Sequence, residues 1–262
     1  MLAPSRNGGS KALLFAIASA LMLISGDSGS VKPSSSSVSS LIKDDSCWTP
    51  PHYNTTVISA FKSKLLENPF PVPEKDPYRL KINTSRVGVC GVKYLDSDRL
   101  KYELNTYPSS KALDEAASKA PGRIYLTHTG PCGLCSTLQD LSAYMQYKDM
   151  TSPVRKCGFK GFVSQKWAMK CLSNLGLTEP CAKIWFYNTR NTRKECLGTC
   201  LRNVNAPYNK PDGSLNDCLQ CDEDKSGPVF KKVAARTRRD SGLESAIKRP
   251  PESISHVNHY YY

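Results

Sequence analysis

The distribution of cysteines constrains this chain more than any other feature. All eleven cysteines lie after residue 46, behind an N-terminal segment with the pattern of a secretory signal. A chain that enters the secretory pathway meets an oxidising environment, where cysteines form disulfides. Because eleven is odd, at least one sulfur is free, metal-bound or paired with another chain. We therefore expect a disulfide-rich protein whose connectivity the sequence alone does not give.

The N-terminal segment carries the prediction of localisation. A basic start precedes residues 12–24, an uncharged apolar run followed by small and polar residues. A helical bilayer span needs about 20 apolar residues, so this shorter run fits a signal peptide over residues 1–26, with a signal anchor as the alternative. Sequons at Asn54 and Asn83 agree with a glycoprotein. A secreted, lumenal or membrane-anchored destination stays open.

Composition divides the remaining chain into three parts. Residues 27–46 are rich in serine and cannot bury enough apolar surface to fold, so we expect a disordered linker. Residues 47–222 hold the cysteines and the apolar periodicity, and they predict a cysteine-rich globular domain. Residues 223–262 predict a basic, partly disordered C-terminal tail. The fold class expected is α+β: a mainly helical, disulfide-rich single domain with a small strand element.

Local patterns place the elements of this domain. One or two strands are expected within residues 79–94 and another over 124–128. Helices are expected over residues 57–66, 111–119, 136–147, 162–175, 180–187, 192–204 and 215–221. Ser136 is the expected cap of the helix over 136–147, with Gln139 in the reciprocal position.

One segment concentrates the residues that could carry chemistry. Residues 123–145 predict a strand, a Gly-Pro turn, a Cys-x-x-Cys pair and a helix. This order puts Cys132 and Cys135 near a helix N-terminus, where the helix dipole favours a thiolate. His128 lies four residues before Cys132. The candidate catalytic residues are therefore Cys132 as nucleophile, Cys135 as resolving thiol and His128 as proton acceptor.

The strand–CGLC–helix arrangement resembles that of thioredoxin-like oxidoreductases, although no aromatic residue precedes Cys132. The resemblance implies that the first cysteine attacks and the second resolves a mixed disulfide. CGLCS also resembles the CGSCW of papain-like proteases, which implies Cys135 as nucleophile with His128 as base. The plainer interpretation of a Cys-x-x-Cys pair in a cysteine-rich secreted chain is a pair of structural disulfide cysteines at a turn.

A second group of cysteines has the spacing of a metal site. Cys196 and Cys200 form one close pair, and Cys218 and Cys221 form another. Two such pairs can present four thiolates to one zinc ion in tetrahedral geometry. The sequence does not determine a cofactor, and zinc is the candidate that these four cysteines offer. An oxidising compartment favours disulfides at the same positions.

The charge of the chain bears on its partners. The formal net charge is +13, and residues 223–262 are rich in lysine and arginine. A secreted chain rarely meets nucleic acid, so the expected partners of this basic tail are acidic glycans or an anionic membrane surface. The main functional prediction is a structural or binding protein of the secretory pathway. The alternatives are a thiol-dependent enzyme acting through residues 128–136 and a zinc-binding protein.

Overall fold

The computed structural model of the protein describes residues 48–66 and 69–262. The predicted signal segment, the serine-rich linker and Cys47 lie outside these described residues. All of the described residues belong to one unit, Asp44–Tyr262. This unit is a mainly helical α+β domain with five disulfides, which confirms the predicted fold class.

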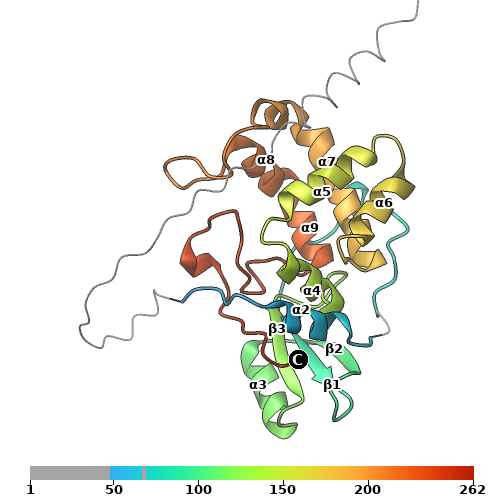
Figure 1. The fold of residues 1–262 in the computed structure, drawn as a ribbon, viewed down its shortest axis with the longest axis vertical. Coiled ribbons are helices and arrows are strands. Elements are labelled where there is room, and N and C mark those ends of the chain that lie inside the picture. The colour runs from blue at the N-terminus through green and yellow to red at the C-terminus, as the bar shows by residue number, and fades with distance from the viewer. Residues whose placement is uncertain (1–47, 67–68) are drawn as a thin grey trace, which may run out of the picture. The chain divides into compact units, whose positions relative to one another are not determined.

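A three-stranded antiparallel sheet forms the strand element (Figure 1). The central strand β1 (Val89–Tyr94) lies between β2 (Tyr102–Tyr107) and β3 (Ile124–Thr129). β1 is buried along nearly its whole length, as its run VCGVKY indicates. The predictions of β1 and β3 are confirmed. β2 was not predicted, because YELNTY is too polar to stand out from a loop.

Eight α-helices are present among the described residues (Figure 1). They are α2 (Thr55–Lys62), α3 (Ser110–Lys119), α4 (Leu138–Gln146), α5 (Thr151–Lys160), α6 (Gln165–Ser173), α7 (Glu179–Arg202), α8 (Asp217–Lys225) and α9 (Gly227–Ala234). Single 3-10 turns lie at Pro77–Arg79 and Pro251–Ser253. Among the described residues, no helix combines the length and the apolar character that a bilayer span requires.

α7 is one continuous helix where the sequence predicted two. The separation was expected at the polar run Asn188–Asn191, in which helix propensity is low. In the structure Asn188 is buried, and its side chain accepts a hydrogen bond of 2.6 Å from the hydroxyl of Tyr78. A tertiary contact therefore compensates for the weak local propensity and carries the helix through this run.

α5 was missed for a related reason. Its sequence contains Pro153 and Gly158 and few apolar residues, so no helical periodicity is visible. Pro153 lies in the first turn, where its missing N–H has no partner to lose. A disulfide between Cys157 of α5 and Cys171 of α6 joins the two helices. This covalent link holds α5 against α6, although α5 has few apolar residues that could pack there.

The capping prediction for α4 was wrong by one residue. Thr137 is the N-cap: its hydroxyl oxygen accepts the backbone N–H of Asp140 at 3.0 Å and donates to the Asp140 carboxylate at 2.6 Å. The expected cap, Ser136, is instead bound to His128 and to the N–H of Gly133. Local spacing alone does not distinguish neighbouring hydroxyl residues, and the tertiary partner of Ser136 decides.

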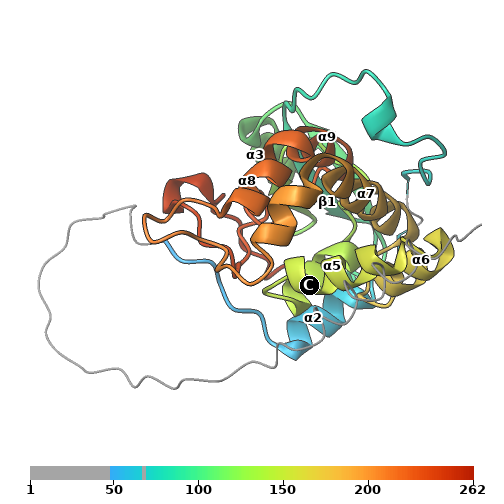
Figure 2. The same ribbon diagram turned by 90° about the horizontal axis from the view of Figure 1, so that it is seen from above.

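Helices cover both faces of the sheet (Figures 1 and 2). On one face, Leu113 of α3 packs with Val89 and Ile124. Gly91 lies on this face, where a Cβ atom would crowd Leu113 and Tyr107. On the other face, α2 and α4 pack over β1, and the remaining helices gather beyond α4. The main core thus lies between the sheet and the helices.

The C-terminal residues are part of the domain, contrary to the expected partly disordered tail. After α9 the chain returns to the sheet (Figure 1). Val257, His259 and Tyr261 are buried, while the residues between them are exposed. This period of two is that of an extended chain with one face against the core. The ring of Tyr261 stacks on Tyr125 of β3 at 5.0 Å. The aromatic side chains of the HVNHYYY end therefore anchor it.

Candidate functional site at the junction of sheet and helices

The segment from His128 to Ser136, termed the junction segment below, leads from the end of β3 into α4. Its turn depends on Gly130, whose φ is +82°, a conformation that favours glycine. The guanidinium of Arg86 lies against Gly130, so a Cβ atom there would collide with it. The turn sets Cys132 and Cys135 just before α4, as the sequence predicted.

The two cysteines of the junction segment are bonded to distant partners and not to each other. Cys132 forms a disulfide with Cys90 of β1, and Cys135 forms one with Cys181 of α7. Cys135 is fully buried. The thiolate is the reactive form of cysteine, so neither sulfur is a nucleophile in this state. Thiol catalysis at Cys132 and Cys135 would first require reduction of these disulfides, and it stays a prediction.

His128 is paired with a serine. Its Nδ1 lies 2.9 Å from the carbonyl oxygen of Thr129, which can only accept, so Nδ1 carries the proton. Its Nε2 lies 2.7 Å from the hydroxyl of Ser136 and accepts from it. The N–H of Gly133 donates to the same hydroxyl at 2.8 Å. Both ring nitrogens of His128 are thus occupied by partners other than a cysteine.

This hydroxyl–imidazole pair is sealed inside the protein. His128 and Ser136 are both 0% exposed. Burial, together with the positive charge of Arg236, pushes the pKa of His128 well below its usual range, so the ring is neutral. A neutral imidazole that accepts a serine proton is the arrangement of a general base. No substrate reaches the pair in this conformation, and its hydrogen bonds connect the end of β3 to the residues before α4.

Arg236 is the centre of the buried polar network. Its Nε donates to the carbonyl of Cys135 at 2.8 Å, and its Nη2 donates to the carbonyl of Ser136 at 2.9 Å and to the hydroxyl of Thr127 at 2.8 Å. Its Nη1 donates to the carbonyl of Thr127 at 3.2 Å and to the hydroxyl of Ser241 at 2.9 Å. All five donors of this fully buried guanidinium are used.

Asp140 is a fully buried acidic residue that, like Arg236, connects several segments through hydrogen bonds. Its carboxylate accepts from the hydroxyl of Thr137, and from the backbone N–H and hydroxyl of Thr178 at 2.8 and 2.9 Å. Burial raises the pKa of Asp140 to about 6, against the opposing effect of these hydrogen bonds and of Arg236. Thr178 begins α7, so Asp140 joins the starts of α4 and α7 beside the Cys135–Cys181 disulfide.

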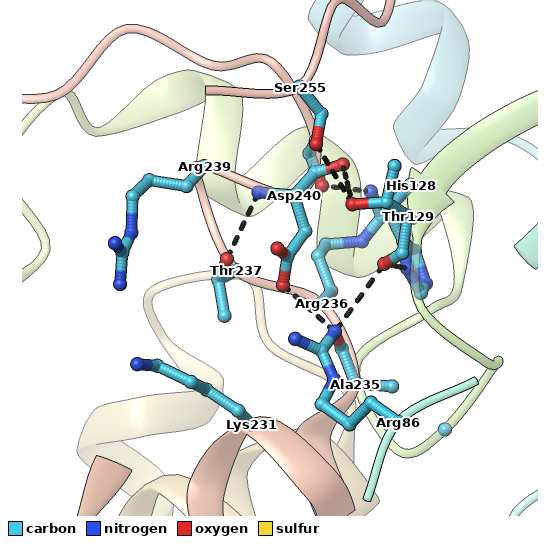
Figure 3. Close-up of polar contacts among 12 residues, drawn as sticks. Arg86, His128, Thr129, Lys231, Ala235, Arg236, Thr237, Arg239, Asp240 and Ser255 are labelled. Atoms are coloured by element: carbon cyan, nitrogen blue, oxygen red, sulfur yellow. Dashed lines mark hydrogen bonds and ion pairs between the residues drawn. The ribbon is translucent and has the colours of Figure 1, made fainter. Parts of the chain in front are cut away.

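A second, partly buried polar cluster lies around Thr129 (Figure 3). Arg86 pairs with Asp240 at 2.9 Å and donates to the carbonyl of Ala235 at 2.6 Å. Thr129 contacts the C-terminal segment twice: its N–H donates to the carbonyl of Asp240, and its hydroxyl lies 2.9 Å from that of Ser255. These contacts fasten the C-terminal segment to β3.

The four cysteines of the predicted zinc site lie together but are oxidised. Cys196 is bonded to Cys221, and Cys200 to Cys218, so two disulfides link α7 to α8. The spacing correctly indicated that the two pairs meet. The described residues contain no group of three or more His, Cys, Asp or Glu side chains arranged around a common metal position. Zinc at these four cysteines requires both disulfides to be reduced, and it stays a prediction.

The residues that organise the site from the C-terminal side were not predicted from the sequence. Arg236, Ser241 and His259 are all fully buried, yet they lie in the region expected to be a tail. His259 accepts from the hydroxyl of Tyr261 at 2.9 Å and donates to the carbonyl of Ser241 at 2.8 Å. Burial, with a smaller effect of Arg236, lowers the pKa of His259 to about 3. Two signals in the sequence pointed to order in this region: apolar residues at helical spacing, among them Phe230, Val233 and Ala234, and the alternation of side chains at 257, 259 and 261.

Comparison with known proteins finds a family match for part of the chain. Residues 165–257 match the model of a family of unknown function, DUF8771. The match runs from the start of α6 to beyond Pro251–Ser253 and includes Arg236, but it begins after the junction segment and does not include it. No curated protein and no solved structure matches the chain.

Proposed function

We propose that this protein is a disulfide-stabilised binding protein of the secretory pathway and that the junction segment is its structural centre. The observation that carries the proposal is the bonding of Cys132 and Cys135. Each of these cysteines ties the junction segment to a different part of the fold, β1 in one case and α7 in the other. This use of a Cys-x-x-Cys pair is that of a scaffold.

The energetics support a structural role. The two disulfides close loops with sequence separations of 42 and 46 residues. In the chain-entropy model, each loop of this length contributes about 4 kcal/mol to stability by restricting the unfolded chain. Five such bonds within one domain also support an oxidising compartment, because the cytosol keeps thiols reduced. The predicted signal peptide over residues 1–26 supports the same route.

The structure also bears on which surface could bind a partner. Most cations of the predicted basic tail are engaged within the domain. Glu223 alone takes three of them, with Lys231 at 2.7 Å, Arg239 at 3.4 Å and Arg249 at 2.6 Å. Arg238 donates to backbone carbonyls, among them that of Tyr147 at 2.6 Å. A binding surface for polyanions is therefore better sought elsewhere on the domain.

The disulfide map tests the proposal against the thiol-enzyme alternative. The native protein is alkylated, digested without reduction and analysed by mass spectrometry. We expect the peptides of Cys132 with Cys90 and of Cys135 with Cys181, and no alkylation at these four positions. A disulfide between Cys132 and Cys135, or a reactive thiol at either, would support the oxidoreductase alternative.

An activity measurement complements the map. The protein is assayed for reduction of insulin disulfides with and without the paired substitution Cys90→Ser and Cys132→Ser. The matched control is Cys157→Ser with Cys171→Ser, which removes a disulfide elsewhere. We expect no activity in any of the three proteins. Activity that is lost only in the Cys90 and Cys132 variant would contradict the structural role.

A further inference from the structure

The α5–α6 hairpin carries an unbalanced positive charge. No aspartate or glutamate occurs between Asp149 and Glu179. Four exposed lysines of this stretch have no ion-pair or hydrogen-bond partner for their ammonium groups within the described structure: Lys156, Lys160, Lys166 and Lys170. Their charges are therefore available to an external anion, unlike those of most C-terminal cations.

Apolar side chains protrude from the same hairpin. Phe162 and Val163 lie in the loop between the two helices and are 50% and 72% exposed. Trp167, in the first turn of α6, is 58% exposed. A soluble domain normally buries such side chains, and a cluster of them on the surface indicates an interaction site. We refer to these three residues and the four lysines as the α5–α6 tip.

The lysines lie close to these apolar residues. Lys156 and Lys160 are one turn apart on α5, so they share a face, and Lys160 accepts the backbone N–H of Val163 through its carbonyl. On α6, Lys166 adjoins Trp167, and Lys170 follows Trp167 by three residues on the same side of the helix. Charged and apolar groups thus alternate over a short stretch of surface.

The tip is held rigidly. The Cys157–Cys171 disulfide joins α5 to α6, and these helices lie side by side in both views of the fold (Figures 1 and 2). The ring of Phe162 stacks on Phe159, with centroids 6.1 Å apart. The guanidinium of Arg193 from α7 lies 4.1 Å from the centre of the Phe162 ring on the described structure. A pre-organised surface loses little entropy when it binds.

From this combination we infer that the α5–α6 tip is a docking surface for an anionic lipid bilayer. The inference rests on the proposed binding function and names its partner. The lysines lie at the level of the anionic headgroups, with their long side chains extended towards the phosphates. Trp167 occupies the interfacial region, which favours its amphipathic ring, and Val163 enters the edge of the acyl chains.

A lipid surface fits the tip better than an acidic glycan does. A glycan would use the lysines and could stack on Trp167. It would gain nothing from Val163, the most exposed of the three apolar side chains and one that neither stacks nor donates hydrogen bonds. Burial of such a side chain is favourable in hydrocarbon, at about 0.8 kcal/mol per CH₂ group. The apolar part of the tip therefore separates the two partners.

Binding of the full, disulfide-intact protein to vesicles tests the inference. Vesicles of phosphatidylcholine alone are compared with vesicles that contain about 30% phosphatidylserine at physiological salt. We expect binding only to the anionic vesicles, with a blue shift of tryptophan fluorescence that Trp167→Phe abolishes. Replacement of the four tip lysines by glutamine lowers the partition coefficient at least about 30-fold, because each cation near the surface contributes ~1 kcal/mol before screening.

Matched variants separate the tip from general charge and general apolarity. The charge control replaces Lys62, Lys81, Lys111 and Lys119 by glutamine, all exposed and outside the tip. The apolar variant, Val163→Ser with Trp167→Ser, is expected to bind at least about 10-fold more weakly. Its control is Leu80→Ser with Val87→Ser, at side chains that are 48% and 73% exposed. Both controls are expected to bind as the unchanged protein does.

Three results would overturn the inference. The first is absence of binding to anionic vesicles. The second is an equal loss of vesicle binding in the tip variants and in their controls. The third is heparin binding that requires the tip lysines, together with vesicle binding that the apolar variant does not weaken. The last result would assign the tip to acidic glycans. Each variant is checked by its circular dichroism spectrum and disulfide map. If the map is as expected and vesicles do not bind, the membrane inference fails while the disulfide-stabilised binding role stands.

Discussion

Substitution of Arg236 tests the buried network most directly. Arg236→Lys keeps the positive charge but reduces five donors to three. At least two of the five acceptors, which are the Thr127, Cys135 and Ser136 carbonyls and the two hydroxyls, then lose their hydrogen bond. A buried acceptor left without a donor costs about 1–3 kcal/mol. We therefore expect Arg236→Lys to lower the free energy of unfolding by about 3 kcal/mol.

Two further variants frame this value. Arg236→Met removes all five donors, so its loss should exceed that of Arg236→Lys even though it also removes the cost of burying a charge. Arg239→Lys is the control: Arg239 is 28% exposed, and its contact with Glu223 is a single ion pair of 3.4 Å. Such partly exposed pairs contribute between 0 and about 1 kcal/mol.

Urea unfolding of the disulfide-intact protein, followed by circular dichroism, provides the measurement. The slope of the free energy against urea concentration must stay unchanged for the values to be comparable. If Arg236→Lys unfolds within about 0.5 kcal/mol of the unchanged protein, the five-donor network does not stabilise the junction segment as argued. An effect of Arg239→Lys as large as that of Arg236→Lys would lead to the same conclusion.

Three other perturbations have expected outcomes. On acidification, an unfolded histidine binds a proton near pH 6.5, whereas folded His259 does so only near its pKa of about 3. Lowering the pH from 7 to 5 should therefore lower the free energy of unfolding by about 2 kcal/mol through His259. His128, whose pKa is also lowered, adds to this loss. The raised pKa of Asp140 in α4 acts in the opposite direction over this pH range. The net loss in the free energy of unfolding, measured by urea titrations at the two pH values, should therefore be smaller than the sum for both histidines. A gain in stability at pH 5 would refute the assignment of neutral, buried histidines. Removal of the Cys157–Cys171 disulfide, with a sequence separation of 14 residues, should cost about 3 kcal/mol and lower the Tm, and an unchanged Tm would contradict this. Thr137→Ala removes the N-cap of α4 and should cost about 1–2 kcal/mol in the same titrations, and a loss no larger than that of an exposed serine-to-alanine control would show that the cap is unimportant.

Local features of the fold were accessible from sequence because they depend on residues near one another in the chain. α3 begins after Ser109, whose side chain accepts from the N–H of Ala112, and ends near Pro121. β1 is an apolar run of the length of a buried strand. In these elements local propensity and burial agree, so the pattern sufficed. α5 and the middle of α7 lack such agreement, and tertiary contacts form them.

The candidate site was found only in part for the same reason. Cys132 and Cys135 were correctly located between β3 and α4, because the strand, turn and helix signals are local. Their bonding to Cys90 and Cys181 depends on how β1 and α7 pack, and sequence spacing does not contain that information. Ser136 was expected to cap a helix and instead binds His128.

The C-terminal residues show the limit most clearly. Residues 223–262 contain many cations and polar residues, and this composition by itself predicts a solvent-exposed tail. The buried position of Arg236 becomes favourable only when Thr127, Cys135 and Ser136 present their oxygen atoms to it. Those residues lie about one hundred positions away in the chain. No local pattern could reveal that a cation would be satisfied by carbonyl groups from another element.

The sequence by itself determined the cysteine-rich character, the mainly helical α+β class and the likeness of residues 1–26 to a secretory signal. These follow from composition and from periodicities of two and 3.6 residues, which act over a few neighbours. The tertiary structure decided which cysteines pair, that residues 223–262 belong to the domain, and that four exposed lysines of the α5–α6 hairpin lie beside exposed apolar side chains. These depend on groups distant in sequence meeting in a low-dielectric interior, where a partner for each buried polar group decides the outcome.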